Sequence, residues 1–181
     1  MANQNLWAPW RMQYMRQLDP SETPAGPATC FLCDAAAFSP DKSAQQQQAA
    51  DHLVVLNDSR GLIILNRYPY TSGHLLVAPA EHLADLSDLS PKQRGDLMEL
   101  TALSQQIILA AYNPQGINIG MNLGRCAGAG LPGHLHVHVV PRWSGDTNFM
   151  AVVGQIRVVP HALEQSYLAL RNALTTIAKT S

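Results

Sequence analysis

The stretch "GHLHVHVVPRW", residues 133–143, places His134, His136 and His138 at every second position, with aliphatic residues between them. Successive side chains of a strand point to opposite faces, so the three imidazoles are predicted to share one face and the aliphatic side chains the core face. Imidazole needs hydrogen-bond partners for both ring nitrogens, and a buried unsatisfied polar group costs about 1–3 kcal/mol. Three such rings in a row therefore indicate either a three-histidine metal site or a phosphate site with a neutral imidazole as nucleophile.

The residues just before the histidines favour the phosphate site. The loop "NLGRCAGAGLPG", residues 122–133, is rich in glycine, which lets backbone amides approach an anion closely. Such a loop directly before the histidines predicts an anion cradle beside a nucleophile, as phosphoryl or nucleotidyl transfer requires. A second polar cluster, "NRYPYTSGH" at residues 66–74, is interpreted on its residues alone as a hairpin with capping groups.

Short apolar runs and two longer periodic segments define the expected fold. Strands are expected at 53–57, 61–66, 74–79, 116–124 and 134–141, and helices at 91–112 and 163–178. Ser90 is the predicted N-cap of the first helix, with Pro91 at its first position. The polar residues 39–51 are expected to form an exposed loop or a loosely held helix. Strands in series with one long helix predict an α+β fold with an antiparallel sheet.

Length and composition indicate one domain and disfavour several partners. The 181 residues suit a single domain with extensions, of which residues 1–29 are the expected N-terminal arm and loop. The formal net charge is −1 and no basic run appears, so no nucleic-acid partner is expected, whereas a small phosphate-bearing ligand remains compatible. No apolar run is long enough to cross a membrane and no signal peptide is recognisable, so we expect a soluble, cytoplasmic protein.

Two of the three cysteines, Cys30 and Cys33, form a Cys-x-x-Cys pair in "CFLC". In a cytosolic chain this spacing indicates metal or redox chemistry more often than a structural disulfide. The redox interpretation is the weaker one, because no thioredoxin-like βαβ pattern surrounds the pair.

The histidine segment at residues 134–140 resembles the motif of the histidine triad (HIT) superfamily, which is His-φ-His-φ-His-φ-φ with φ apolar. The segment "HLHVHVV" fits this motif at every position. "NRYPYTSGHLLVAPAEH" is similar to the family's nucleotide-binding strand-turn-strand, and "NIGMNLG" to the strand that carries a phosphate-proximal amide. The N-terminal "LWAPWRMQYM" and the later "VPRWSGDTNFM" resemble the bacterial branch of diadenosine tetraphosphate phosphorylase-like proteins.

The resemblance implies a HIT-like fold: a mainly antiparallel five-stranded sheet with one long helix and a C-terminal helix. It places the HIT domain at residues 30–142. Residues 143–181 then form a C-terminal extension whose helix packs on the domain or on a dimer partner. The resemblance also implies a homodimer.

The resemblance further implies nucleotidyl transfer from a dinucleoside polyphosphate, or a related adenylated compound, through a covalent intermediate. The middle histidine, His136, is the expected nucleophile that attacks the α-phosphate, with its second ring nitrogen held as a donor by a carbonyl of the glycine-rich loop. His138 is expected to donate to a non-bridging or leaving oxygen, and His74 to support the triad.

The expected substrate contacts come from three places in the chain. Asn66 is expected to meet the ribose, and Asn122 the phosphate. Several HIT branches carry Gln or Ser shortly before the triad, whereas this chain has Ala129-Gly130-Leu131. The backbone amides of Gly128, Ala129 and Gly130 are therefore expected to contact the polyphosphate instead.

Several functional alternatives remain open. Water as acceptor gives hydrolysis, and inorganic phosphate gives phosphorolysis. An adenosine phosphoramidase-like hydrolase, a non-catalytic nucleotide-binding protein and a metal-dependent hydrolase with all three histidines as ligands are the other candidates. No organic cofactor is expected.

The first triad histidine has a separate expected role. Some bacterial members resemble the galactose-1-phosphate uridylyltransferase branch, which binds structural zinc through a Cys-x-x-Cys, a later histidine and the first triad histidine. The matching positions here are Cys30, Cys33, His82 and His134. Two cysteines and two histidines make a closed tetrahedral set, so the expected zinc is structural.

Overall fold

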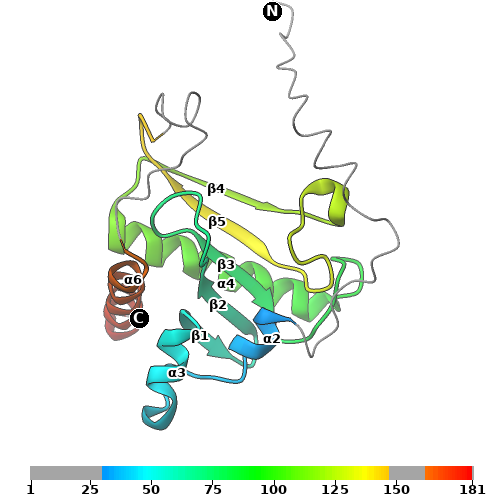
Figure 1. Cartoon of the computed structure of the whole chain (residues 1–181), viewed down its shortest axis with the longest axis horizontal. Coiled ribbons are helices and arrows are strands. Elements are labelled where there is room, and N and C mark those ends of the chain that lie inside the picture. Colours follow the sequence, from blue (N-terminus) through cyan, green and yellow to red (C-terminus); the bar gives the residue numbers. More distant parts are fainter. Residues whose placement is uncertain (1–29, 147–161, 181) are drawn as a thin grey trace, which may run out of the picture.

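The structure, a computed structural model, describes residues 30–146 and 162–180 (Figure 1). The predicted arm and loop over residues 1–29 lie outside the described residues. Five strands form one sheet in the order β1-β2-β3-β5-β4, and every neighbouring pair is antiparallel. The α+β fold with a five-stranded antiparallel sheet is therefore confirmed.

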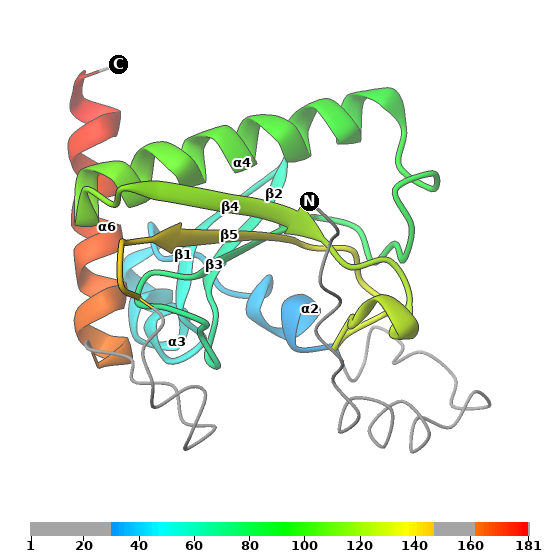
Figure 2. The same ribbon diagram turned by 90° about the horizontal axis from the view of Figure 1, so that it is seen from above.

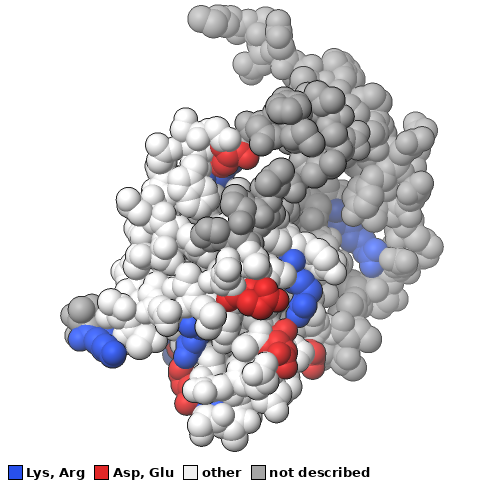
Figure 3. All heavy atoms as spheres, turned by 60° about the vertical axis from the view of Figure 1, so that its left-hand side comes forward, with Lys and Arg blue, Asp and Glu red and all other residues white. Residues whose placement is uncertain are grey.

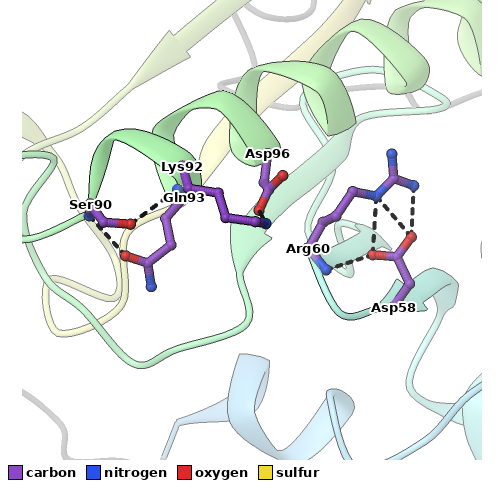
Figure 4. Close-up of polar contacts among 6 residues, drawn as sticks. All are labelled: Asp58, Arg60, Ser90, Lys92, Gln93 and Asp96. Atoms are coloured by element: carbon purple, nitrogen blue, oxygen red, sulfur yellow. Dashed lines mark hydrogen bonds and ion pairs between the residues drawn. The ribbon is translucent and has the colours of Figure 1, made fainter.

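The first two strands, β1 (Val54–Asp58) and β2 (Gly61–Leu65), lie at the first two predicted strand positions and form a hairpin. The carboxylate of Asp58 closes its two-residue turn, because it accepts the Arg60 backbone N–H at 2.8 Å and pairs with the Arg60 guanidinium at 2.6 Å (Figure 4). Gly61 begins β2 with φ +150° and lies against β3 (Leu75–Pro79). A Cβ at this glycine would lie 2.2 Å from the Ala78 carbonyl oxygen, so only glycine fits.

The histidine-bearing strand is shorter than predicted. β5 is Val137–Arg142 and pairs with β3 on one side and with β4 (Gly116–Met121) on the other. The prediction that it begins at His134 is wrong, because the backbone groups there have other partners. The Leu135 N–H donates to the Leu83 carbonyl at 2.7 Å, and the His134 carbonyl accepts from the His136 ring at 2.9 Å. Of the three histidines, only His138 is a strand residue.

The long helix α4 (Pro91–Tyr112) covers one side of the sheet (Figure 2). Its start is the predicted one: Ser90 Oγ accepts the Gln93 N–H at 3.2 Å, and the Gln93 side chain accepts the Ser90 N–H at 2.8 Å. Figure 4 shows this reciprocal pair beside the turn of the first hairpin. Buried leucines and isoleucines face the sheet, so packing as well as capping stabilises the helix.

The C-terminal helix α6 (Leu163–Thr180) packs against α4 and β1 of the same chain. Tyr167, Leu170 and Ala173 are buried in the core, and Arg171 donates to the Val55 carbonyl at 2.7 Å. The helix therefore belongs to the same packed unit as the sheet. The domain boundaries at residues 30, 142 and 143 stay predictions.

Two short helices precede the sheet. They are α2 (Phe31–Ala35) and α3 (Gln46–Asp51), the latter following the 3-10 turn η2 (Ser43–Gln45). Both lie on the side of the sheet opposite α4 (Figure 2). The polar segment 39–51 is thus helical in its second half, and α2 places Cys30 at its N-cap and Cys33 within it.

On the face drawn in Figure 3, acidic and basic side chains lie close to one another rather than in a broad area of one sign. Arg171 and Asp41 form an ion pair at 2.8 Å. Within residues 30–146 and 162–180, no helix combines the length and the apolar character needed to cross a membrane.

Candidate active site and metal site

The middle histidine, His136, is oriented by the main chain. Its Nδ1 lies 2.9 Å from the carbonyl oxygen of His134, and the residue is almost fully buried. A carbonyl oxygen only accepts, so Nδ1 carries the proton and Nε2 keeps a lone pair. Burial lowers the pKa of His136, which favours the neutral, nucleophilic ring. The carbonyl belongs to His134 and not to the glycine-rich loop, which corrects that detail of the prediction.

The other two predicted catalytic histidines form a hydrogen-bonded relay. The Tyr70 backbone N–H and the Asn66 side-chain amide both point at Nδ1 of His74, each at 3.2 Å. Because a backbone N–H only donates, Nδ1 of His74 is the acceptor and its Nε2 carries the proton. This Nε2–H donates to Nδ1 of His138 at 3.0 Å. His138 in turn keeps its own proton on Nε2 and offers a donor there.

His138 performs this role as a neutral ring. Burial, and then repulsion between His138 and His136 when both rings are protonated, lowers the pKa of His138 from 6.5 to about 4. The His136 and His138 rings lie side by side, with centroids 5.0 Å apart and planes inclined at 60°. Within residues 30–146 and 162–180, Nε2 of His136 thus offers a lone pair beside a ring that offers an N–H. This pairing suits attack on a phosphorus atom with donation to one of its oxygens.

The loop before His74 is held against the long helix. Gly73 has φ +81°, and a Cβ there would lie 2.5 Å from the Tyr112 ring of α4. Thr71 Oγ1 donates to the Pro141 carbonyl of β5 at 2.9 Å. The loop is therefore fixed at both sides, which places His74 beside His138.

The predicted ribose contact, Asn66, stabilises this loop in the structure. Its Oδ1 accepts the Tyr68 N–H at 3.0 Å, while its Nδ2 points at His74. Its role toward a ribose stays a prediction.

The predicted phosphate cradle is an exposed loop containing the 3-10 turn η3 (Arg125–Ala127). Asn122 Nδ2 donates to the Gly128 carbonyl at 3.4 Å. The Gly128 N–H donates to the Arg125 carbonyl at 2.9 Å and the Ala129 N–H to the Gly124 carbonyl at 3.4 Å. These two amides have partners within the loop, and Gly130 is exposed. Phosphate binding by this loop, Asn122 included, stays a prediction.

The four predicted metal ligands converge. One ligand atom from each of Cys30, Cys33, His82 and His134 lies within 4.8 Å of the others. The sulfur of Cys33 is 3.2 Å from Nδ1 of His82 and 3.5 Å from Nδ1 of His134, and the sulfur of Cys30 is 3.4 Å from the latter. Zinc bonds of about 2.0–2.3 Å give tetrahedron edges of about 3.3–3.8 Å, and these three distances are close to such edges, while the 4.8 Å limit for the whole set requires the donors to close slightly on the ion.

The surroundings of this cluster suit a cation. The His134 ring donates its Nε2–H to the Pro79 carbonyl at 3.1 Å, which leaves Nδ1 unprotonated for a metal. Burial lowers the pKa of His134 and favours the neutral ring that a ligand requires. Burial, with the hydrogen bond and charge of Cys30, raises the pKa of Cys33 to about 11. A bound cation reverses this effect by stabilising the thiolates.

The triad is therefore divided between two sites. Nδ1 of His134 faces the cysteine sulfurs and its Nε2 faces the Pro79 carbonyl. His136 and His138 lie outside the metal-ligating cluster. In the part of the chain that the structure describes, no group of metal-ligating side chains includes all three histidines. The arrangement disfavours the metal-dependent hydrolase with a three-histidine centre.

Several residues that build the site were not predicted from the sequence. The ring of Tyr70 lies 4.6 Å from that of His74 and 6.0 Å from that of His138, nearly parallel to the latter. Leu83 and Pro79 contribute only their carbonyl oxygens, which are common to all residues. The one available signal was the position of Tyr70, four residues before His74 in the polar cluster.

Comparison with known proteins agrees with this geometry. A family model described as the HIT domain matches residues 47–145. The fold, the histidine spacing and this match define the class, and the chain belongs to the HIT family.

Particular relatives narrow the comparison. The AP-4-A phosphorylase of Mycobacterium tuberculosis is 36% identical over 172 residues, which cover 90% of this chain and 80% of the relative. The asymmetrical bis(5'-nucleosyl)-tetraphosphatase of Schizosaccharomyces pombe is 37% identical over 82 residues, or 45% of this chain and 44% of that protein. A crystal structure of a zinc-bound histidine triad family protein from Mycobacterium smegmatis has a TM-score of 0.63 and 30% identity, and the match covers 86% of this chain and all of that one.

Proposed function

We propose that this HIT-family enzyme transfers a nucleotidyl group from a dinucleoside polyphosphate of the diadenosine tetraphosphate kind through a nucleotidyl-His136 intermediate. The observation that carries the proposal is the 2.9 Å hydrogen bond from Nδ1 of His136 to the His134 carbonyl. It leaves Nε2 as a buried, neutral nucleophile.

In the first step, the Nε2 lone pair of His136 attacks the α-phosphorus and forms a P–N bond. The bond between that phosphorus and the bridging oxygen breaks, and the leaving polyphosphate takes the electron pair. The ring becomes cationic, and the His134 carbonyl stabilises it through the Nδ1–H. The Nε2–H of His138 donates to a phosphate oxygen, so no step requires His138 to be charged.

In the second step, an acceptor oxygen attacks the same phosphorus and the P–N bond breaks, which returns the electron pair to Nε2. Water gives a nucleoside monophosphate and releases a proton to solvent. Inorganic phosphate gives a nucleoside diphosphate. The similarity to the M. tuberculosis AP-4-A phosphorylase over most of both chains favours phosphate as the acceptor. The adenosine phosphoramidase-like and non-catalytic alternatives predict no phosphate-dependent products.

Product analysis tests this proposal. Diadenosine tetraphosphate is incubated with the enzyme in the presence and absence of inorganic phosphate, and the nucleotides are separated. ADP plus ATP indicates phosphorolysis and AMP plus ATP indicates hydrolysis, both through the adenylyl intermediate. Two ADP indicates hydrolysis at the β-phosphorus and contradicts attack on the α-phosphorus. His136→Ala is expected to abolish turnover, with His52→Ala as a matched histidine control outside the site. Full activity of the His136→Ala enzyme contradicts the nucleophile assignment.

We also propose that the metal is one structural zinc ion held by Cys30, Cys33, His82 and His134. It ties α2, the segment after β3 and the segment before β5 together. Elemental analysis is expected to find about one zinc per chain in the wild type and none in Cys30→Ser/Cys33→Ser. Equal metal content in both proteins contradicts the assignment. Reduced thiols are stable in the cytoplasm, where we place the protein.

The proposed homodimer would join two chains through β4. This strand lies at the edge of the sheet, pairs with β5 on one side, and has largely exposed residues. Ile119, on β4, is 49% exposed, and Leu123, just beyond it, is 42% exposed. An exposed edge with apolar side chains is a template for pairing with a second chain. Light scattering is expected to give twice the chain mass for the wild type and one chain mass for Ile119→Lys; a monomeric wild type contradicts this.

A further inference from the structure

We propose that His134 links the metal site to the nucleophile, so that metal binding holds His136 in its reactive tautomer. The inference rests on the proposed roles of the zinc ion and His136. It assigns His134 the function of a positioning residue: its ring belongs to one site and its carbonyl oxygen to the other.

The ring of His134 is buried, and its two nitrogens have partners of unequal strength. Nε2 donates to the Pro79 carbonyl at 3.1 Å, whereas Nδ1 has the two sulfurs at 3.4 and 3.5 Å. Thiols are weak hydrogen-bond partners, so without a metal these contacts hold the ring weakly. A metal ion replaces them with a bond of about 2.0–2.1 Å to Nδ1.

The backbone of His134 is connected to the second histidine ligand. The residue after His134, Leu135, donates its N–H to the carbonyl of Leu83, the residue after His82, at 2.7 Å. When His82 and His134 bind one ion, the ion and the hydrogen bond between Leu135 and Leu83 together restrain the main chain around His134. The His134 carbonyl, which accepts the proton of His136, is part of the same piece.

The consequence concerns the tautomer of His136. In water, neutral histidine side chains favour the Nε2–H form, which has no lone pair at Nε2 for a phosphorus atom. The His134 carbonyl reverses that preference by accepting from Nδ1. If the carbonyl moves when the metal leaves, a fraction of His136 returns to the unreactive form. Loss of a partner that orients a functional histidine costs about 10–100-fold, so we expect at least a 10-fold slower formation of the nucleotidyl-enzyme.

A set of three variants tests this link. Cys30→Ser/Cys33→Ser has lost two ligands and is expected to be metal-free. His82→Cys keeps four ligands as a Cys3His set, and a thiolate reaches about as far from Cβ as a ring that ligates through Nδ1. Cys126→Ser removes the exposed cysteine that is not part of the cluster and serves as the matched control.

Two readouts are needed besides metal content. Long-range 1H–15N NMR spectra report which ring nitrogen of His136 carries the proton, with the signal assigned from His136→Gln. Rapid quench with diadenosine tetraphosphate gives the rate at which the covalent adenylyl-protein forms. The metal-free variant is expected to show a mixture of tautomers and the slower rate, whereas Cys126→Ser should match the wild type. In His82→Cys, the Nδ1–H fraction and the rate should rise above those of the metal-free variant in proportion to the zinc that the protein holds.

The proposal is overturned if metal-free, folded protein keeps His136 fully in the Nδ1–H form and forms the adduct at the wild-type rate. Circular dichroism establishes folding, and if the double variant does not fold, chelator-treated wild-type protein with and without added zinc replaces it. Absence of an adduct in zinc-loaded wild-type protein, or zinc content unchanged in the double variant, instead refutes the proposed function on which the link rests.

Discussion

The relay from Tyr70 to His138 predicts opposite behaviour for two conservative substitutions of His74. An asparagine amide oxygen takes roughly the place of Nδ1, so His74→Asn keeps an acceptor for the Tyr70 N–H but loses the donor to His138. A glutamine amide nitrogen takes roughly the place of Nε2, so His74→Gln keeps the donor and loses the acceptor. His74→Asn therefore removes the 3.0 Å hydrogen bond to His138, and His74→Gln removes the acceptor of the 3.2 Å hydrogen bonds from the Tyr70 N–H and the Asn66 amide.

The magnitude follows from the burial of these groups. His74 has no exposed surface, and the His138 ring beside it is partly buried. A buried acceptor left without a partner costs about 1–3 kcal/mol. Because the Nδ1 atom of His138 is that acceptor, the loss is expected to appear as a 5- to 150-fold lower kcat in His74→Asn, at about 1.36 kcal/mol per tenfold. His74→Gln should lose less than about tenfold.

The assay measures kcat and KM with diadenosine tetraphosphate, together with urea unfolding of both variants. His74→Gln loses at least as many hydrogen bonds as His74→Asn, so its unfolding free energy should fall by at least as much, at about 1 kcal/mol per bond. The difference in kcat then reports the donor to His138 rather than general damage. If His74→Asn is as active as His74→Gln, the relay does not orient His138 and the tautomer argument is refuted.

Three further predictions concern stability. The pKa of His138 is about 4 in the folded protein and 6.5 in the unfolded chain, so the unfolded chain binds the proton first as the pH falls. The unfolding free energy should therefore be highest above pH 6.5 and fall between pH 6.5 and about 4, less steeply in His138→Asn than in the wild type. Equal slopes for the two proteins in urea titrations contradict this. Gly61→Ala should lower the unfolding free energy by at least about 2 kcal/mol, because its Cβ meets the Ala78 carbonyl. A Cβ at Gly95 meets no atom within 4 Å, so Gly95→Ala should instead raise the unfolding free energy by up to about 1 kcal/mol, and thermal melts measure both changes. Ser90→Ala should cost about 1 kcal/mol by removing the N-cap, and an unchanged melting temperature argues against the cap.

The parts of the fold that depend on side-chain pattern were predictable from the sequence. The helix from Pro91 to Tyr112 follows from an N-cap, a proline and helical spacing, and the structure has the same bounds. The first hairpin follows from two β-branched runs around a short turn. The convergence of Cys30, Cys33, His82 and His134 was implied by the family resemblance, and the structure brings the four together.

The parts that depend on backbone groups were not predictable. Alternation around His134, His136 and His138 predicts a strand through all three, but periodicity carries no information on where a carbonyl or an N–H finds its partner. The strand begins only at Val137, because a side chain and a distant loop use the backbone groups before it. Tyr70 was missed for the same reason, since its hydrogen bond to His74 comes from its main chain.

The docking of α6 on β1 has a consequence for the order in which the molecule assembles. The Arg171 side chain reaches the Val55 carbonyl across 116 residues of sequence, and Tyr167 and Leu170 fill the same core as the first hairpin. Contacts of such separation form late, because the loop-closure entropy is lost before they stabilise anything. On the ribosome, the β1-β2-β3 meander can pair as soon as it emerges, but its outer surface stays unfilled until α6 has been synthesised. The nascent chain therefore exposes apolar surface over most of its translation, which makes it a candidate client for chaperones that bind such surfaces.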